Sequence, residues 1–174
     1  MRIFLVDVSE FFSSNSASEY KVSEHPLGLM ALLTYLNHHM GERVAGKIVK
    51  SHVDFDSFEE MTSLISEFAP DVIGLRTLSL YKDFFAEAVA EIKKNFPNIP
   101  VIAGGPHPTI DAKRVLEETS VDIVVIGEGE ETLLELCQMM DRRKRQALPL
   151  LSRDELYNVK GIAFMPLRVE ENTE

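Results

Sequence analysis

The feature that most constrains the fold of this chain is a regular alternation of short apolar runs with amphipathic stretches. The apolar runs lie at residues 2–8, 44–50, 71–75, 101–103 and 122–126. Runs of this kind are typical of strands buried on both faces of a parallel sheet. The stretches between them predict helices over 26–40, 55–68, 81–96, 110–118 and 131–143. The alternation therefore predicts an α/β fold, with one five-stranded parallel sheet and helices on both faces.

Local signals support the ends of these helices. Pro26 suits the first turn of a helix, where its missing N–H is not needed, and Gly41 suits a helix end. Asp56 or Ser57 can cap the helix that follows. The basic run 142–145 is interpreted as a helix C-terminus favoured by the dipole, with a binding patch as the less favoured alternative. Residues 161–165 predict one more strand, at an edge of the sheet.

Composition limits the classes of function. A length of 174 residues suits one domain, which we assign to residues 1–170, with 171–174 as a frayed tail or the start of a linker. The single cysteine, Cys137, excludes a disulfide framework and an iron–sulfur cluster held by this chain alone. A net charge of −10 disfavours nucleic acid as a partner. The sequence contains neither an apolar run near the length of a membrane span nor a secretory leader, so we expect a cytoplasmic protein without a membrane partner.

The carboxyl ends of the predicted strands are the expected position of a ligand, as in other open parallel sheets. The residues that follow the strands there are small or polar. They are Asp7 and Ser9, then Arg76, Thr77, Leu78 and Ser79, then Gly104, Gly105, Pro106, His107 and Thr109, and finally Gly127, Glu128, Gly129 and Thr132.

Two glycine segments bear on the kind of ligand. Gly104 and Gly105 allow a ligand to approach bare backbone, although a tight strand-to-helix turn explains them equally well. The segment 127–129 lacks the third glycine of a dinucleotide fingerprint, and the chain contains no P-loop motif. Acidic residues at 128, 130 and 131 would repel phosphate. The site is therefore expected to hold something large that is not strongly anionic.

Taken together, these segments resemble the N-terminal cobalamin-binding domain of cobalamin-dependent radical S-adenosylmethionine enzymes. The matching pieces follow one another in the right order and at the right spacing. They are His-Pro-Leu-Gly-Leu at 25–29, Pro-Asp-Val-Ile-Gly at 70–74, Arg-Thr-Leu-Ser at 76–79, Tyr-Lys-Asp-Phe-Phe at 81–85, Gly-Gly-Pro-His at 104–107, Val-Asp at 121–122, Gly-Glu-Gly-Glu at 127–130 and Val-Lys-Gly-Ile-Ala at 159–163.

The resemblance implies a flavodoxin-like Rossmann fold with strand order 2-1-3-4-5. It implies that cobalamin lies flat over the strand ends, with its nucleotide tail against the glycine pair. The residues implied as cofactor-binding are those named at the strand ends, together with Tyr81. S-adenosylmethionine and an iron–sulfur cluster would belong to a barrel domain in a parent chain or a separate subunit. This chain alone is not expected to be catalytic.

Two residues depart from related patterns. In the motif D-x-H-x-x-G the histidine ligates cobalt, but here His25 is preceded by Ser23 in place of the aspartate that would orient the imidazole. We therefore expect no protein ligand to cobalt and a cofactor with its base detached. Arg76 stands where many cobalamin domains have serine or threonine, and it either pairs with an acid such as Asp7 or lies beneath the corrin.

Two other classes of function stay open. The first is a protein interaction module that has the sheet and no cofactor. Phosphotransfer is disfavoured in such a module, because Arg76 and Thr77 follow the third strand and no lysine follows the fifth. The second is a flavin carrier, for which the serine-rich residues 13–16 would form the phosphate loop.

Overall fold

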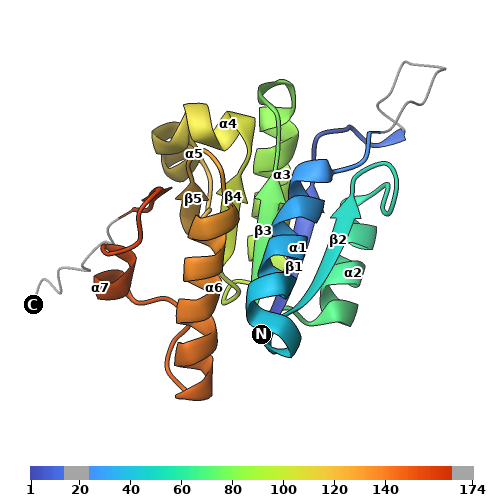
Figure 1. Cartoon of the computed structure of the whole chain (residues 1–174). Coiled ribbons are helices and arrows are strands. Elements are labelled where there is room, and N and C mark those ends of the chain that lie inside the picture. Colours follow the sequence, from blue (N-terminus) through green and yellow to red (C-terminus); the bar gives the residue numbers. More distant parts are fainter. Residues whose placement is uncertain (14–23, 166–174) are drawn as a thin grey trace, which may run out of the picture.

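The computed structural model describes residues 1–13 and 24–165, and its six strands form one sheet in the order β2-β1-β3-β4-β5-β6 (Figure 1). The strands are β1 (Arg2–Asp7), β2 (Ala45–Lys50), β3 (Val72–Arg76), β4 (Val101–Gly104), β5 (Ile123–Val125) and β6 (Ile162–Ala163). The strands β1 to β5 are parallel, and β6 pairs antiparallel with β5. The expected order of five parallel strands and the extra edge strand are both confirmed.

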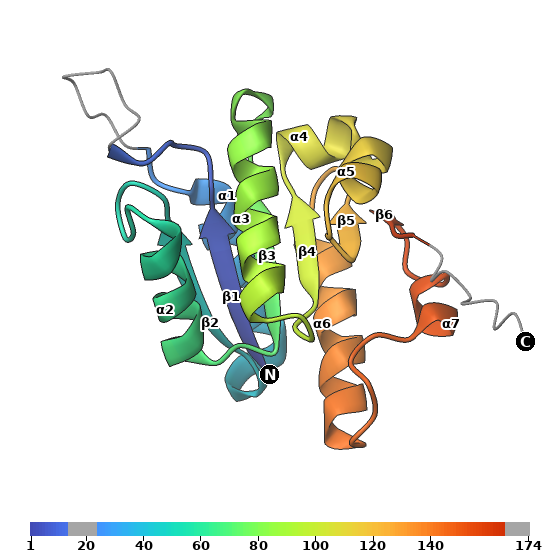
Figure 2. The same cartoon turned by 180° about the vertical axis from the view of Figure 1, so that it is seen from behind.

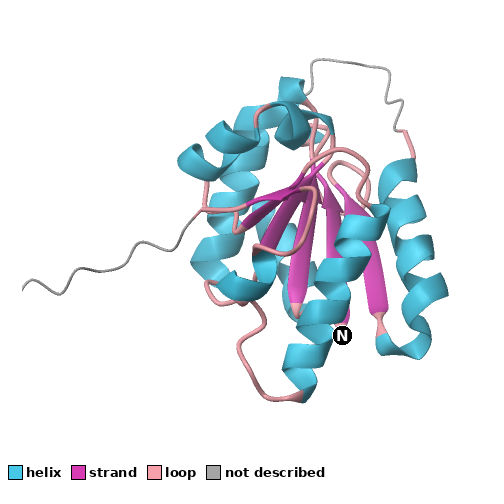
Figure 3. Cartoon of the chain, turned by 60° about the vertical axis from the view of Figure 1, so that its left-hand side comes forward, coloured by secondary structure: helices cyan, strands magenta, loops and turns pink. Residues whose placement is uncertain are grey.

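Helices cover both faces of the sheet, as Figures 2 and 3 show. The helices are α1 (Leu27–Met40), α2 (Phe58–Phe68), α3 (Lys82–Asn95), α4 (Pro106–Ile110), α5 (Ala112–Glu118), α6 (Glu130–Arg145) and α7 (Arg153–Leu156). On one face lie α1 and α6, and on the other lie α2, α3 and α5. The short helix α7 lies beside α6 near the β6 edge, and α4 lies at the carboxyl end of β4.

The apolar run of β1 is buried on both faces, which explains why it lacks a polar alternation. Ile3 and Leu5 pack with the layer of α1 and α6, whereas Phe4 and Val6 pack with the opposite layer. All four side chains are at most 2% exposed. A strand with this pattern needs a helical layer on each side, so the sequence of β1 already favours a sheet in the middle of three layers.

Helix ends follow the local signals. Ser57, rather than Asp56, caps α2, and its Oγ accepts a hydrogen bond from the Glu60 amide at 3.1 Å. The Glu60 carboxylate in turn accepts from the Asp56 amide at 2.7 Å, so two amide donors near the helix start are satisfied. Gly41 ends α1 with φ of +56°, a conformation that favours glycine.

The region after β4 differs from the prediction of a single helix over 110–118. Two helices, α4 and α5, meet at Asp111, and α4 begins at Pro106. Prolines usually indicate a break, but Pro106 and Pro108 lie in the first turn of α4, where no intrahelical N–H donor is required. The single-turn helix α7 was also not predicted from the sequence.

The basic run at the end of α6 is occupied by ion pairs. Arg142 and Arg143 both contact the Glu155 carboxylate, and Lys144 Nζ lies 2.6 Å from an Asp71 oxygen. Arg145 Nη2 lies 3.1 Å from Asp141 Oδ2. These contacts support the interpretation of the run as a helix end rather than a binding patch. They tie the end of α6 to α7 and to the start of β3.

Two features noted in the sequence, the lack of a long apolar run and the single cysteine, can be compared with the structure. Within residues 1–13 and 24–165, no helix combines the length and the apolar character needed to cross a membrane. Cys137 lies on the buried face of α6, and burial raises the pKa of its thiol to about 12. Its thiol is therefore protonated at neutral pH.

A pocket at the carboxyl ends of the strands

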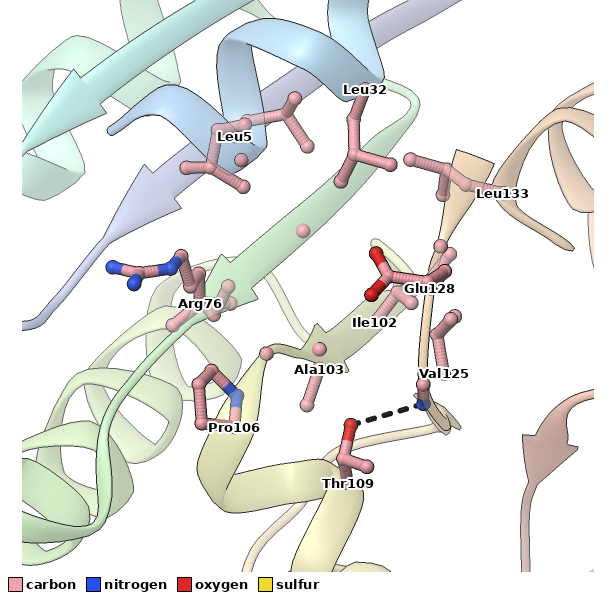
Figure 4. Close-up of a pocket in the computed structure, with 18 of the residues that line it drawn as sticks. Leu5, Leu32, Arg76, Ile102, Ala103, Pro106, Thr109, Val125, Glu128 and Leu133 are labelled. Atoms are coloured by element: carbon pink, nitrogen blue, oxygen red, sulfur yellow. Dashed lines mark hydrogen bonds between the residues drawn. The ribbon is translucent and has the colours of Figure 1, made fainter. Parts of the chain in front are cut away.

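A pocket of about 500 Å³ opens at the carboxyl ends of the central strands. It extends between the sheet and the helical layer of α1 and α6, and α4 forms one side of it (Figure 4). Parallel strands direct all their carboxyl ends to one edge of the sheet, and the helices that follow begin there. The position of the pocket is thus a consequence of the topology.

The inner wall of the pocket is built from aliphatic side chains. The sheet contributes Leu5, Ile102 and Val125, and the helices contribute Leu29, Leu32 and Leu133. Between them the lining consists of small residues, Gly28, Gly74 and Ala103. In Figure 4 the side chains of Leu5, Leu32 and Leu133 lie on one side of the space and Ala103 and Pro106 on the other. This part of the pocket suits an apolar, flat group.

The two glycines at the end of β4 have different roles in the lining. A Cβ at Gly104 would meet no atom within 4 Å, so a side chain there would enter open space beside the pocket. A Cβ at Gly105 would lie 2.9 Å from Arg76 Cγ, and Gly105 has φ of +95°. Gly105 is therefore required by the turn itself, whereas Gly104 leaves room for a ligand.

The rim of the pocket is held together across two loops. The Gly127 amide donates to Thr109 Oγ1 at 3.1 Å, which joins α4 to the loop between β5 and α6. Gly127 has φ of +79°. In the same loop, Glu128 is exposed and its carboxylate points towards the interior of the pocket in Figure 4. Gly129 and Pro106 complete the predicted residues of this rim.

Arg76 marks the border between the pocket and a set of buried polar groups. It lines the pocket, but its Nη1 donates to Asp7 Oδ2 at 2.9 Å and to Ser9 Oγ at 3.3 Å. Asp7 is fully buried, and its other oxygen accepts from the Ser9 amide at 3.0 Å and from the Ser9 hydroxyl. In Figure 4 the guanidinium points away from the leucines. The pairing of Arg76 with Asp7 is therefore confirmed.

A second ion pair lies next to Asp7 on the neighbouring strand. Lys50 is the register partner of Asp7, and its buried Nζ lies 2.9 Å from Glu10 Oε1. The same Nζ donates to the Glu24 carbonyl at 2.7 Å, so Lys50 holds the chain on both sides of residues 11–23. We call Asp7, Ser9, Glu10, Lys50 and Arg76 the charged cluster.

The remaining predicted site residues do not line the pocket. Thr77 is buried and donates through Oγ1 to the Val8 carbonyl at 3.4 Å. Leu78 precedes a 3₁₀ turn over Ser79–Tyr81, in which the Tyr81 ring lies 4.8 Å from the Phe11 ring. His107 is half-buried in α4, and Thr132 donates to the Lys160 carbonyl at 3.3 Å.

Two sequence hypotheses involve residues outside the described ranges. His25 is exposed just before α1 and does not line the pocket, while Ser23, which stands in place of an orienting aspartate, lies outside the described residues. The flavin hypothesis rests on 13–16, of which 14–16 also lie outside them. Ser13 itself contacts the side of the molecule away from the pocket, because its amide donates to Asp56 at 2.6 Å.

Sequence reasoning missed the aliphatic wall of the pocket. Leu29 and Leu32 share the apolar stripe of α1, and Leu5 and Ile102 belong to buried strands, so their spacing is that of ordinary core residues. The available signal was indirect. Gly28, in the first turn of α1, is a small residue where a Cβ would meet no atom within 4 Å. Gly74, inside β3, is small for another reason, because a Cβ there would lie 2.7 Å from Leu5 Cδ2.

Comparisons with known proteins agree with one another. The family model described as B12 binding domain matches residues 17–137. An uncharacterized methyltransferase of Pyrococcus horikoshii is 34% identical over 145 residues, which is 82% of this chain and 30% of that protein. An anaerobic magnesium-protoporphyrin IX monomethyl ester cyclase of Cereibacter sphaeroides is 28% identical over 116 residues, 62% of this chain and 19% of that protein.

Solved structures share the fold. The radical S-adenosylmethionine methyltransferase TsrM from Kitasatospora setae superimposes with a TM-score of 0.72 at 16% identity, over 97% of this chain and 29% of that chain. The cobalamin-dependent S-adenosylmethionine radical enzyme OxsB, with aqua-cobalamin and S-adenosylmethionine bound, gives 0.74 at 19% identity, over 95% and 21%. The chain thus spans less than a third of the length of each of these proteins.

Proposed function

Because this chain belongs to the B12-binding domain family, we propose that its pocket holds cobalamin on behalf of a radical S-adenosylmethionine methyltransferase or a related enzyme. The observation that carries the proposal is the aliphatic inner part of the pocket, which we call the slot and which is lined by Leu5, Leu29, Leu32, Ile102, Val125 and Leu133. At its entrance, Gly104 presents backbone without a side chain. The class of enzyme is suggested by the relative described as a methyltransferase and by the solved structures of radical S-adenosylmethionine enzymes with cobalamin bound, and it is a proposal for this chain.

The residues of the pocket fit cobalamin in two respects. The aliphatic wall around Leu32 and Leu133 suits the flat, apolar base of the nucleotide tail. Gly104 borders open space that a side chain at this position would occupy, since a Cβ there would meet no atom within 4 Å. The rim is acidic at Glu128 and Glu130, which is compatible with the amide-bearing edge of a corrin and unfavourable for a strongly anionic ligand.

Each part of the site has a distinct task in this proposal. The slot holds the tail, and the bond from Gly127 to Thr109 keeps its rim closed. Asp7 and Ser9 act as positioning residues through Arg76, whose side chain they fix at the edge of the pocket. Thr77, Leu78, Ser79, Tyr81, His107 and Thr132 do not line the pocket, and contacts between them and the cofactor stay a proposal from the resemblance. When bound, cobalamin supplies a cobalt centre able to carry a methyl group.

We further propose that no side chain of this protein ligates cobalt and that the base of the tail is detached from it. His25 is exposed beyond the pocket lining, and Arg76 is a permanent cation whose guanidinium has no free lone pair to donate. The test is electron paramagnetic resonance of the bound cobalt(II) form. The spectrum should lack nitrogen superhyperfine splitting, and clear splitting would contradict the proposal.

S-adenosylmethionine and the iron–sulfur cluster are assigned to a barrel in the same parent chain or in a separate subunit. The single cysteine of this sequence cannot provide the thiolates of such a cluster. Methyl transfer is therefore expected only when that barrel is supplied, and not from this chain with cobalamin and S-adenosylmethionine alone.

The direct test of the proposed function is retention of the cofactor. Protein incubated with hydroxocobalamin should keep its red colour through gel filtration, with the absorbance of the base-off form. A flavin incubated in the same way should separate from the protein. If all the red colour separates while the protein elutes as a folded monomer or defined oligomer, the proposal is wrong.

A further inference from the structure

We propose that the slot selects the base of the cobamide tail and prefers an apolar arene to a purine. This inference rests on the proposed function and concerns the class of cobamide that the site accepts. Cobamides share the corrin and differ in the base of the nucleotide, which can be a benzimidazole, a purine or a phenol. The slot wall is the part of the protein that would contact this base.

The side chains of the slot offer the base no hydrogen bond. The large side chains of the wall are aliphatic and include Leu5, Leu29, Leu32, Ile102, Val125 and Leu133, and the lining also contains Leu75 and Ile110. The backbone of the sheet behind them is engaged in strand pairing, because β3 pairs with β4 and β4 with β5 at the level of Ile102 and Ala103. Within residues 1–13 and 24–165, neither these side chains nor the paired strand backbone therefore offers a hydrogen-bond donor to a ring nitrogen.

The four polar side chains that line the pocket lie at its rim or are already engaged. Arg76 is bound to Asp7 and Ser9, and Thr109 Oγ1 accepts from the Gly127 amide. Glu128 and Glu130 belong to the loop and helix start after β5, and the Glu128 carboxylate points towards the interior of the pocket (Figure 4). An ionised carboxylate accepts hydrogen bonds and cannot donate one. The ring nitrogens of a purine in the slot would thus lose water and gain no donor from these side chains.

Unpaired burial of a polar group weakens binding by roughly one to two orders of magnitude per group. Adenine carries several such groups, whereas dimethylbenzimidazole presents mainly methyl and ring carbon atoms. We therefore expect an adenine-tailed cobamide to bind at least about tenfold more weakly than cobalamin. A tail of p-cresol, which cannot coordinate cobalt, should be accepted at least as well as dimethylbenzimidazole.

The energy of detaching the base from cobalt does not explain the expected order of affinities for the three cobamides. Adenine is the weaker ligand of cobalt, so its detachment costs less and would favour the adenine cobamide. A preference for cobalamin over the adenine cobamide must then arise from the slot. The base of the p-cresol cobamide does not coordinate cobalt, so the affinity for this cobamide includes no energy of detachment.

The experiment measures the dissociation constants of the protein for cobalamin, its adenine and p-cresol counterparts, and cobinamide, which lacks a tail. We expect tight binding of cobalamin and the p-cresol cobamide, at least tenfold weaker binding of the adenine cobamide and the weakest binding of cobinamide. Equal affinity for the adenine cobamide and cobalamin would overturn the inference and leave the proposed function standing. Retention of none of the four would overturn both.

A pair of variants on α1 locates the preference in the slot. Leu32→Gln introduces an amide into the wall at a half-buried position, and Ala31→Gln introduces the same group at an exposed neighbouring position. Leu32→Gln should bring the dissociation constants for cobalamin and the adenine cobamide closer together, while Ala31→Gln should leave their ratio unchanged. An identical ratio in Leu32→Gln and the unmodified protein would contradict a role for the wall.

Discussion

The charged cluster and the pocket lie at the same edge of one sheet, yet they treat polar groups in opposite ways. In the charged cluster, the buried charges of Asp7 and Lys50 meet Arg76 and Glu10 at 2.9 Å. In the pocket, the backbone of Gly104 is bare, and Glu128 has no ion-pair or hydrogen-bond partner within residues 1–13 and 24–165. Buried charges that pair with one another stabilise the fold. Polar groups without a partner, next to open space, indicate where a ligand is accommodated.

This contrast predicts that variants of the pocket lose binding and variants of the charged cluster lose stability. The largest effect is expected for Gly104→Val. Its branched side chain would enter open space that we assign to the cofactor, so cobalamin affinity should fall by at least about 100-fold, or about 2.7 kcal/mol. Equilibrium binding of hydroxocobalamin measures this loss, and denaturant unfolding should show a much smaller change.

Two further substitutions control for volume and strain. Gly104→Ala adds one methyl group and should give an intermediate loss, while Ala90→Val on the exposed side of α3 adds carbon atoms far from the pocket and should bind normally. Gly105→Val is less informative, because the positive φ of Gly105 would strain the turn. Normal cobalamin affinity in Gly104→Val would place the tail elsewhere.

The opposite behaviour is expected for Lys50→Met. The substitution leaves the partly buried Glu10 carboxylate and the Glu24 carbonyl without their ammonium partner. Removing one member of a buried pair is strongly destabilising, and the partial exposure of Glu10 reduces the expected cost to about 2 kcal/mol. Chemical denaturation measures it, and cobalamin affinity of the folded protein should change by less than about threefold.

The double variant Lys50→Met/Glu10→Gln sharpens this result. If part of the cost arises from the loss of the ammonium beside the Glu10 carboxylate, the second substitution should restore part of the stability lost in the first. Additive losses would instead mean that Lys50 stabilises the fold through its contact with the Glu24 carbonyl alone.

Arg76 belongs to both regions and should give a smaller, mixed effect. Arg76→Lys keeps a cation beside Asp7 but replaces the planar guanidinium, whose Nη1 donates to both Asp7 and Ser9, with a compact ammonium. We expect a loss of about 1 kcal/mol in unfolding free energy and a fall in cobalamin affinity of no more than about tenfold. A change confined to stability would assign Arg76 to the charged cluster alone.

The smallest effect is expected for His25→Ala. The imidazole is exposed and lies outside the pocket lining, so affinity should stay within about twofold of the unmodified protein. The electron paramagnetic resonance spectrum of bound cobalt(II) should also be unchanged. Nitrogen splitting that is present in the unmodified protein and absent from His25→Ala would identify His25 as the cobalt ligand after all.

The fold was predictable because its strands are buried on both faces. A run such as 2–8 carries no polar alternation, and only a sheet between two helical layers accommodates it. The strand order required the resemblance to a family, since periodicity does not determine which strands are neighbours. The helix α4 escaped prediction because Pro106 and Pro108 look like a break until their place in a first turn is known.

The residues at the rim of the candidate site could be predicted from the sequence, whereas the residues of its aliphatic wall could not. Gly104 ends β4, Thr109 lies in the helix that follows it, and Gly127 lies in the loop after β5, so the topology brings the three together. Leu32 and Leu133 differ in no sequence property from leucines that pack against the sheet, and only the space left beside them distinguishes them. Arg76 was predicted to pair with Asp7 or to lie at the cofactor, and the structure shows that the first does not prevent it from bordering the pocket.

The contacts of Lys50 also bear on how this domain tolerates changes in length. One ammonium group contacts both Glu10 and Glu24, so two positions well separated in the sequence are held close together. The entropy of closing a chain segment between two fixed points grows only slowly with the number of residues in it. A change in the number of residues between Glu10 and Glu24 would thus alter the entropic cost of this closure only slightly.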